Sequence, residues 1–230
     1  MARLPRFFAP GFPLHVIQRG NNRGALFFKK SDYPLYLEFL AEAAIRYGCA
    51  VHAYVLMTNH VHLLLTPDQP ESLPKTLQSL GRRYVQYVNA SHQRTGTLWE
   101  GRYRATLIDG DSYFLTCSRY IELNPVRAEM VVHPREYLWS SYHAHANGKK
   151  DSLLTPHALY RGLGRTAAER QKAYRALFRH HLSGETIEEI REATNKAWVL
   201  GSDRFKTRLA KKLNRRVSPL PRGRPRLGSE

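Results

Sequence analysis

Cysteine is scarce in this sequence. Cys49 and Cys117 are the only two among 230 residues, and they form no Cys-x-x-Cys pair. This argues against a disulfide scaffold and a thiolate zinc site, and it is typical of proteins in a reducing cytoplasm. No apolar run reaches the roughly 18 residues that cross a bilayer, and the N-terminus lacks the apolar segment of a signal peptide. We expect a cytoplasmic protein without a membrane partner.

Signatures of several enzyme classes are also missing. The sequence has no Walker loop, no glycine-rich dinucleotide motif and no Ser-His-Asp order, so we expect no nucleotide cofactor. Acidic residues are few: 36 Lys and Arg against 19 Asp and Glu give a formal net charge of +17. A protein with such a surplus of positive charge usually binds a polyanion. We therefore expect a nucleic-acid partner and association with the nucleoid.

The basic surplus is concentrated late in the chain. Residues 1–148 carry 16 basic and 11 acidic side chains, whereas residues 149–230 carry 20 basic and 8 acidic ones. The polar, glycine-containing stretch 145–151 between them has the composition of a linker. We predict a first domain over residues 1–148 and a basic, mainly helical region over residues 149–230.

Hydrophobic spacing and capping residues predict the elements of the first domain. In order, they are a strand over 15–19, a helix from 31–32 to 48, two tightly joined strands or one bent strand over 51–65, a helix over 71–90, a strand over 96–108 and a helix from 111–112 to 124. This order predicts an α+β fold, a ferredoxin-like (RRM-like) antiparallel sheet with helices on one face.

One predicted strand carries two histidines. In Asn59-His60-Val61-His62, alternation along the strand points His60 and His62 to one face and Val61 to the other. Two imidazoles about 7 Å apart along a strand can close on one divalent ion. A pair of half-buried histidines on a sheet surface is the alternative interpretation, and the pattern alone leaves both open.

The last predicted helix of the domain carries a tyrosine and an asparagine on one face. Tyr120 and Asn124 are four residues apart, so they lie one turn apart on a helix. If this face turns toward the histidine strand, a phenol and a carboxamide converge on the two imidazoles. The alternative is a core tyrosine and a C-terminal capping asparagine before Pro125. Spacing does not decide between them.

These motifs together resemble a known family. His60-Val61-His62 matches the HUH motif, and the segment 119–128 resembles the tyrosine helix of single-tyrosine HUH transposases. The best match is the branch of REP-associated tyrosine transposases, which the segments 12–21 and 96–103 also resemble. The resemblance covers roughly residues 1–145, and the combination of motifs is more specific than any one of them.

The resemblance implies an enzyme. His60, His62 and Asn124 would bind Mg²⁺ or Mn²⁺, and Tyr120 would be the catalytic nucleophile. A phenol is a poor nucleophile at neutral pH. A cation bound at the scissile phosphate would help it, because the cation neutralises developing charge and orients the phosphoryl oxygens. The implied reaction is cleavage and strand transfer of single-stranded DNA through a 5′-phosphotyrosine, at hairpin (REP-like) repeats. The resemblance favours a monomer over a homodimer.

Basic side chains in three places are candidates for DNA contact. They are Arg82 and Arg83 on the second helix, Arg102 and Arg104 beside Trp99 and Tyr103, and Arg222, Arg224 and Arg226 in the tail. The tail resembles the core of an AT-hook, which lays arginines into a narrow minor groove, but runs of Arg, Pro and Gly also occur as featureless disordered tails. Trp99 and Tyr103 can equally be core residues. Two helices, from about 186 and 202, predict either a helix-turn-helix or a plain helical hairpin.

Two other functions fit part of the sequence. One is a noncatalytic DNA- or RNA-binding regulator on the same scaffold. The combination of His60, His62, Tyr120 and Asn124 disfavours it. The other is a relaxase-type or replication-initiator nickase. A lone tyrosine late in the domain, followed by Asn-Pro, disfavours that.

Overall fold

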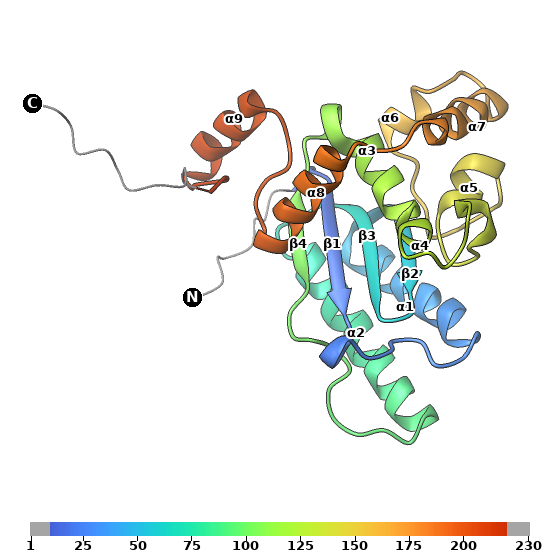
Figure 1. Ribbon diagram of the computed structural model, residues 1–230. Coiled ribbons are helices and arrows are strands. Elements are labelled where there is room, and N and C mark those ends of the chain that lie inside the picture. Colours follow the sequence, from blue (N-terminus) through green and yellow to red (C-terminus); the bar gives the residue numbers. More distant parts are fainter. Residues whose placement is uncertain (1–9, 220–230) are drawn as a thin grey trace, which may run out of the picture.

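Four strands form one antiparallel sheet in the order β2-β3-β1-β4 (Figure 1). This computed structural model describes residues 10–219. The strands are β1 (Leu14–Arg19), β2 (Cys49–Met57), β3 (His60–Pro67) and β4 (Arg104–Leu107). Between them and after them lie the helices α1 (Asp32–Tyr47), α2 (Ser72–Ser91), α3 (Gly110–Glu122) and α4 (Asn124–Arg127). The predicted order of elements is confirmed.

The chain beyond the sheet is helical. It comprises α5 (Tyr142–Asn147), α6 (Ala158–Arg161), α7 (Ala167–Ala176), α8 (Gly184–Lys196) and α9 (Asp203–Leu213). Three short 3-10 turns complete the described chain, η1 (Asn21–Arg23), η2 (Pro134–Glu136) and η3 (Leu177–Arg179). Among residues 10–219, no helix combines the length and the apolar character needed to cross a membrane.

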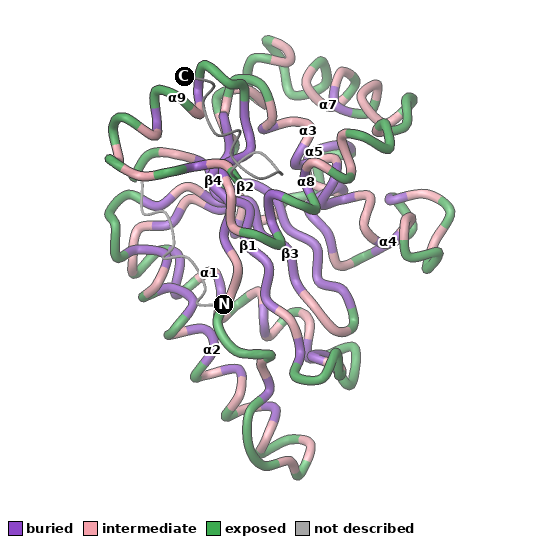
Figure 2. Tube along the Cα trace, turned by 60° about the vertical axis from the view of Figure 1, so that its left-hand side comes forward, coloured by how far each residue is buried: buried purple, intermediate pink, exposed green. Residues whose placement is uncertain are grey.

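One face of the sheet forms the main hydrophobic core with α1 and α2. Alternate strand residues such as Val16, Val61 and Leu63 point to this face and pack with Leu40 of α1 and Leu80 of α2. Gly48 ends α1 in the left-handed conformation, with φ 70°, as its position in the sequence predicts. Figure 2 shows the sheet as a buried centre between helices whose outer surfaces are exposed.

The second face is also covered, by α3 and α8. Phe114 and Ile121 of α3 pack with Val55 and Leu64, and Ile190 of α8 joins the same cluster. The α+β class and the antiparallel sheet are confirmed, but helices cover both faces of the sheet instead of the single face we expected. The reason is that the apolar stripe of α3 and the distant helix α8 both find apolar strand residues on this face.

Two predicted boundaries are wrong. The strand expected over 96–108 is confined to β4, because Gly96 and Gly101 adopt positive φ values of 80° and 97° and turn the chain before it. The helix expected to open at Thr186 begins at Gly184, where the Ser183 side chain accepts a hydrogen bond from the Thr186 amide. Ser202 caps α9 in the same way. Because α8 packs on the sheet, one of the two helices of the predicted hairpin is part of the fold itself.

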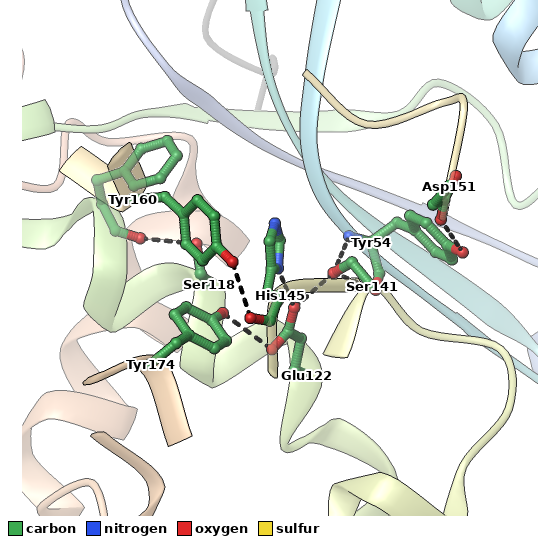
Figure 3. A network of polar contacts seen from close by, with 9 residues as sticks. Tyr54, Ser118, Glu122, Ser141, His145, Asp151, Tyr160 and Tyr174 are labelled. Carbon is green, nitrogen blue, oxygen red and sulfur yellow. Dashed lines mark hydrogen bonds and ion pairs between the residues drawn. The ribbon is translucent and has the colours of Figure 1, made fainter. Parts of the chain in front are cut away.

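A buried carboxylate ties the end of α3 to the C-terminal helices (Figure 3). Glu122 is 0% exposed. It accepts hydrogen bonds from Ser141 Oγ at 2.6 Å, from His145 Nδ1 at 2.8 Å and from Tyr174 OH at 2.9 Å. The carboxylate also raises the pKa of Tyr174, although burial is the larger cause. This network holds the C-terminal end of α3, two residues beyond Tyr120.

Candidate active site

A cavity of about 290 Å³ lies on the second face of the sheet. The register of the strands creates it, because Arg19 of β1 pairs with His60 of β3 and Ile17 pairs with His62. Both histidines thus share one face with alternate residues of β1, as their spacing predicts. The lining residues are Ile17, Arg19, Met57, His60, His62, Tyr120, Asn124, Arg127, Ala128, Arg191, Thr194 and Asn195. Tyr120, Asn124, His60 and His62 are therefore brought together.

His60 is half-buried and is oriented by its neighbour. Its Nδ1 lies 2.7 Å from Oδ1 of Asn59, whose amide nitrogen donates to the carbonyl of Arg23. Because that Asn59 oxygen can only accept, His60 Nδ1 carries the proton and Nε2 keeps its lone pair. Burial lowers the pKa of His60 to about 4, so the imidazole is neutral at physiological pH.

His62 lies deeper and contacts another histidine. It is 3% exposed, and its Nδ1 lies 2.7 Å from Nε2 of His15 on β1. The two rings stack with centroids 5.0 Å apart. Burial lowers the pKa of His62 well below its ordinary value and that of His15 to about 3. Both rings are therefore neutral. The His60 and His62 centroids are 5.1 Å apart.

The tyrosine helix faces these imidazoles. The ring of Tyr120 is 6.1 Å from that of His62, centroid to centroid, and Tyr120 is 6% exposed. The amide nitrogen of Asn124 donates to the carbonyls of Tyr120 and Ile121 at 3.3 and 3.4 Å. The carboxamide oxygen is consequently the atom that Asn124 can offer to a cation.

The donor set of the cavity fits a weakly held divalent cation. His60, His62 and Asn124 offer two neutral nitrogens and one amide oxygen, and within residues 10–219 no three His, Cys, Asp or Glu side chains form a metal cluster. Imidazole and amide donors accept Mn²⁺ and Mg²⁺ without the thiolates that favour zinc. The residues present are therefore compatible with such an ion.

Three arginines of the cavity were missed from the sequence. Arg127 stacks on Tyr120, with Cζ 4.1 Å from the ring centroid, and its Nη2 donates to the Tyr120 carbonyl at 2.7 Å. Its Nη1 is buried with no hydrogen-bond partner among the described residues, and burial lowers the pKa of the guanidinium. Arg19 and Arg191 line the same cavity. Alternation along β1 could have identified Arg19, but nothing in the sequence links Arg191 to the site.

The arginines predicted for DNA contact are distributed differently. Arg82 and Arg102 are exposed and line shallow grooves between α2 and the segment before β4, where Arg82 lies beside Trp99 and Arg102 beside Tyr103. Arg83 instead forms an ion pair with Glu42 of α1. Arg104 donates to Oδ1 of Asn195 at 2.7 Å, next to the cavity. Trp99 and Tyr103 pack against the main core. Arg222, Arg224 and Arg226 lie outside the described residues.

Among the comparisons with known proteins, a family model shows the family and one solved structure shows the fold. The family described as "Transposase IS200 like" matches residues 10–124. The fold is similar to that of the REP-associated tyrosine transposase bound to a REP hairpin, with a TM-score of 0.55 and 16% identity over 68% of this chain and 93% of that chain. An inferred transposase of Deinococcus radiodurans has a TM-score of 0.37 and 21% identity over 53% of this chain and 96% of that one. No curated protein matches this chain.

Proposed function

This chain belongs to the family of IS200-like transposases, as the resemblance of its motifs indicated, and on that premise we propose that it cleaves and rejoins single-stranded DNA through a 5′-phosphotyrosine. The observation that carries this proposal is the cavity that gathers Tyr120, His60, His62 and Asn124. A tyrosine beside two neutral imidazoles and an amide is the arrangement that such chemistry requires.

In this proposal, His60, His62 and Asn124 hold one Mg²⁺ or Mn²⁺ ion. When bound, the ion supplies positive charge that neutralises the scissile phosphate and orients its oxygens. The lowered pKa values keep both imidazoles neutral at neutral pH, so each ring retains one nitrogen with a free lone pair. Protons therefore compete with a metal for His60 only as the pH falls toward about 4.

Tyr120 is the proposed nucleophile. Its hydroxyl oxygen forms a bond to phosphorus, the bond from phosphorus to the 3′ oxygen breaks, and the proton lost from the tyrosine is balanced by one taken up by the leaving 3′ oxygen. The products are a DNA 3′-hydroxyl and a 5′-phosphate esterified to Tyr120. Because the ester retains the bond energy, a second 3′-hydroxyl can reverse the step and join a new strand. No nucleotide cofactor is needed.

The arginines of the cavity are proposed to receive the phosphate. Arg19, Arg127 and Arg191 line it, and the buried Nη1 of Arg127 has no hydrogen-bond partner in the described chain. A guanidinium suits a phosphate because it offers several donors in one plane. Stacking on the Tyr120 ring places this guanidinium next to the nucleophile.

The proposed substrate is a hairpin with a single-stranded flank. The support is the fold shared with a REP-associated transposase that was solved with a REP hairpin. Arg82 and Arg102 on the exposed grooves, with Arg222, Arg224 and Arg226 of the tail, would contact the backbone. His62 and Tyr120 meet within one chain, which favours a monomer. The proposed nucleophile and metal ligands lie within residues 1–148, but α8 adds Arg191 and Thr194 to the cavity, so the proposed site extends past the predicted division near residue 148.

The test is a covalent adduct. The purified protein is incubated with Mn²⁺ and labelled single-stranded hairpin oligonucleotides from the flanks of its own gene, and denaturing gels separate the products. We expect a protein–DNA adduct that Tyr120→Phe and chelation of the metal both abolish. Retained DNA binding without an adduct on any flank would contradict the proposal and favour a noncatalytic regulator. An adduct that survives Tyr120→Phe would assign the nucleophile elsewhere.

A further inference from the structure

We propose that Thr194 and His15 form a hydrogen-bond relay that holds His62 in the tautomer able to bind a metal through Nε2. Both are positioning residues, since neither needs to touch the ion or the DNA. The relay rests on the proposed function, because it assigns a purpose to His62 as a ligand. It joins three elements, since Thr194 lies on α8, His15 on β1 and His62 on β3.

The direction of the relay is fixed at its outer end. The hydroxyl oxygen of Thr194 lies 2.6 Å from the carbonyl of Ile190. A carbonyl can only accept, so the single proton of the hydroxyl is donated to Ile190. The same oxygen lies 3.2 Å from Nδ1 of His15. With its proton engaged, Thr194 must accept there, and His15 Nδ1 must carry a proton.

The second and third links follow from the first. His15 is 0% exposed, and burial favours the neutral imidazole, so a proton on Nδ1 leaves Nε2 as an acceptor. His62 Nδ1 lies 2.7 Å from that nitrogen and must therefore donate. The proton of neutral His62 is then on Nδ1, and its Nε2 has a free lone pair. His62 also lines the cavity.

The opposite tautomer is disfavoured by burial. His15, Thr194 and His62 are 0%, 2% and 3% exposed, so water cannot replace a lost partner. With the proton of His62 moved to Nε2, His15 would have to donate from its Nε2, which leaves its Nδ1 as a bare acceptor. Two acceptors would then face each other between His15 and Thr194 unless the hydroxyl abandoned Ile190. A buried mismatch of this kind leaves an acceptor unsatisfied and so disfavours this tautomer.

The same logic applies to a metal-bound histidine in general. Ligating imidazoles donate their other N–H group to a fixed acceptor, and removing that acceptor or its support lowers metal affinity by about 10- to 100-fold. Here the acceptor is itself a histidine, and its state is set by a threonine. His60 has its own acceptor, Oδ1 of Asn59. The two ligands are therefore oriented independently.

The experiment compares Thr194→Val with Thr194→Ser in the full chain. Valine keeps the shape of threonine but removes the hydroxyl, whereas serine keeps it. Thr207→Val, an exposed threonine of α9, is the matched control. ¹⁵N NMR of the imidazoles at neutral pH identifies the tautomer of His62, and titration with Mn²⁺ alone, followed by electron paramagnetic resonance, gives the Kd.

We expect wild-type His62 to show the Nδ1–H tautomer. Thr194→Val should mix the tautomers and raise the Kd for Mn²⁺ by about 10-fold, whereas Thr194→Ser and Thr207→Val should keep wild-type values. An Nε2–H tautomer in the wild-type protein would overturn the relay, without any variant. So would unchanged Mn²⁺ affinity and an unchanged tautomer in a folded Thr194→Val.

Failure of the relay is distinguishable from failure of the proposed function. If the wild-type protein forms the Tyr120 adduct while Thr194→Val leaves tautomer and Kd unchanged, only the relay is wrong. If Mn²⁺ binds and responds to Thr194 as expected but no adduct forms, the relay stands and Tyr120 chemistry is wrong. Thermal unfolding of each variant verifies that it is folded before either comparison.

Discussion

Replacing Arg127 with methionine should slow formation of the Tyr120–DNA adduct without unfolding the protein. The guanidinium stacks 4.1 Å from the centre of the Tyr120 ring, and its buried Nη1 has no hydrogen-bond partner among the described residues. We assign that free donor to a phosphate oxygen. Methionine keeps the apolar stem that lines the cavity but removes the charge and every donor.

The expected loss follows from one charged hydrogen bond. Such a bond contributes about 1.5–3 kcal/mol, and each 1.36 kcal/mol is a tenfold change in rate. The adduct should therefore form about 10- to 150-fold more slowly in Arg127→Met. Arg127→Lys keeps the charge but cannot stack and reach the Tyr120 carbonyl together, so its loss should be smaller, about 5- to 10-fold.

The assay is a rapid-quench, single-turnover time course at saturating Mn²⁺, with the adduct measured on denaturing gels. Arg46→Met is the matched control, because Arg46 also lies over a tyrosine ring, that of Tyr47, but on α1 and outside the cavity. Urea unfolding of each variant separates lost stability from lost chemistry. A rate for Arg127→Met within twofold of wild type would refute the assignment of this arginine to the phosphate.

Three further predictions concern stability and binding. Glu122→Gln should lower the free energy of unfolding by about 3 kcal/mol, because the new amide NH₂ group would face a side chain that also donates, in a buried network. An unchanged urea midpoint would exclude this loss of stability. His52 is buried, which lowers its pKa from 6.5 to about 4. Between pH 6.5 and pH 4, His52 is therefore protonated in the unfolded chain but remains neutral in the folded one. Protonation of His52 in the unfolded chain therefore lowers the free energy of unfolding by about 3 kcal/mol as the pH falls from 6.5 to 4. The difference in unfolding free energy between wild type and His52→Gln should shift by that amount between pH 7 and pH 4. Finally, Arg102→Ala should reduce the salt dependence of single-stranded DNA binding by about 0.7 in the log–log slope. Arg83→Ala should leave the slope unchanged, because Arg83 is paired with Glu42 of the same chain. Equal slopes for Arg102→Ala and wild type would remove Arg102 from the interface.

Local periodicity was sufficient to predict four of the residues that line the cavity. Alternation along β3 sets His60 and His62 on one face, and helical spacing sets Tyr120 and Asn124 one turn apart. These are short-range rules that hold wherever the chain forms the predicted element. Their convergence in one cavity depended on which face α3 packs against. The apolar residues Phe114 and Ile121 decide that, and they were visible in the sequence only as a helical stripe.

Other features of the site depend on contacts between distant segments that no local pattern encodes. His15 and Thr194 are 179 residues apart, and Arg191 reaches the cavity only because α8 packs on the sheet. In the segment before β4, by contrast, a local pattern is present but predicts the wrong structure. Its aromatic residues favour a strand, but Gly96 and Gly101 take backbone conformations that end one. Conformational freedom at glycine therefore outweighed side-chain preference there.

The wall that α8 contributes to the cavity also has a temporal consequence. A ribosome synthesises this chain from the N-terminus, so the sheet, with its last strand ending at Leu107, is complete well before Gly184 to Lys196 of α8 are made. During that interval the nascent chain gains Tyr120 and already has both imidazoles, but Thr194 does not yet exist to orient His62 through His15. On the proposed relay, the metal site would thus reach its full affinity only once α8 has been made. Fragments that end before α8 should bind Mn²⁺ less tightly than the full chain.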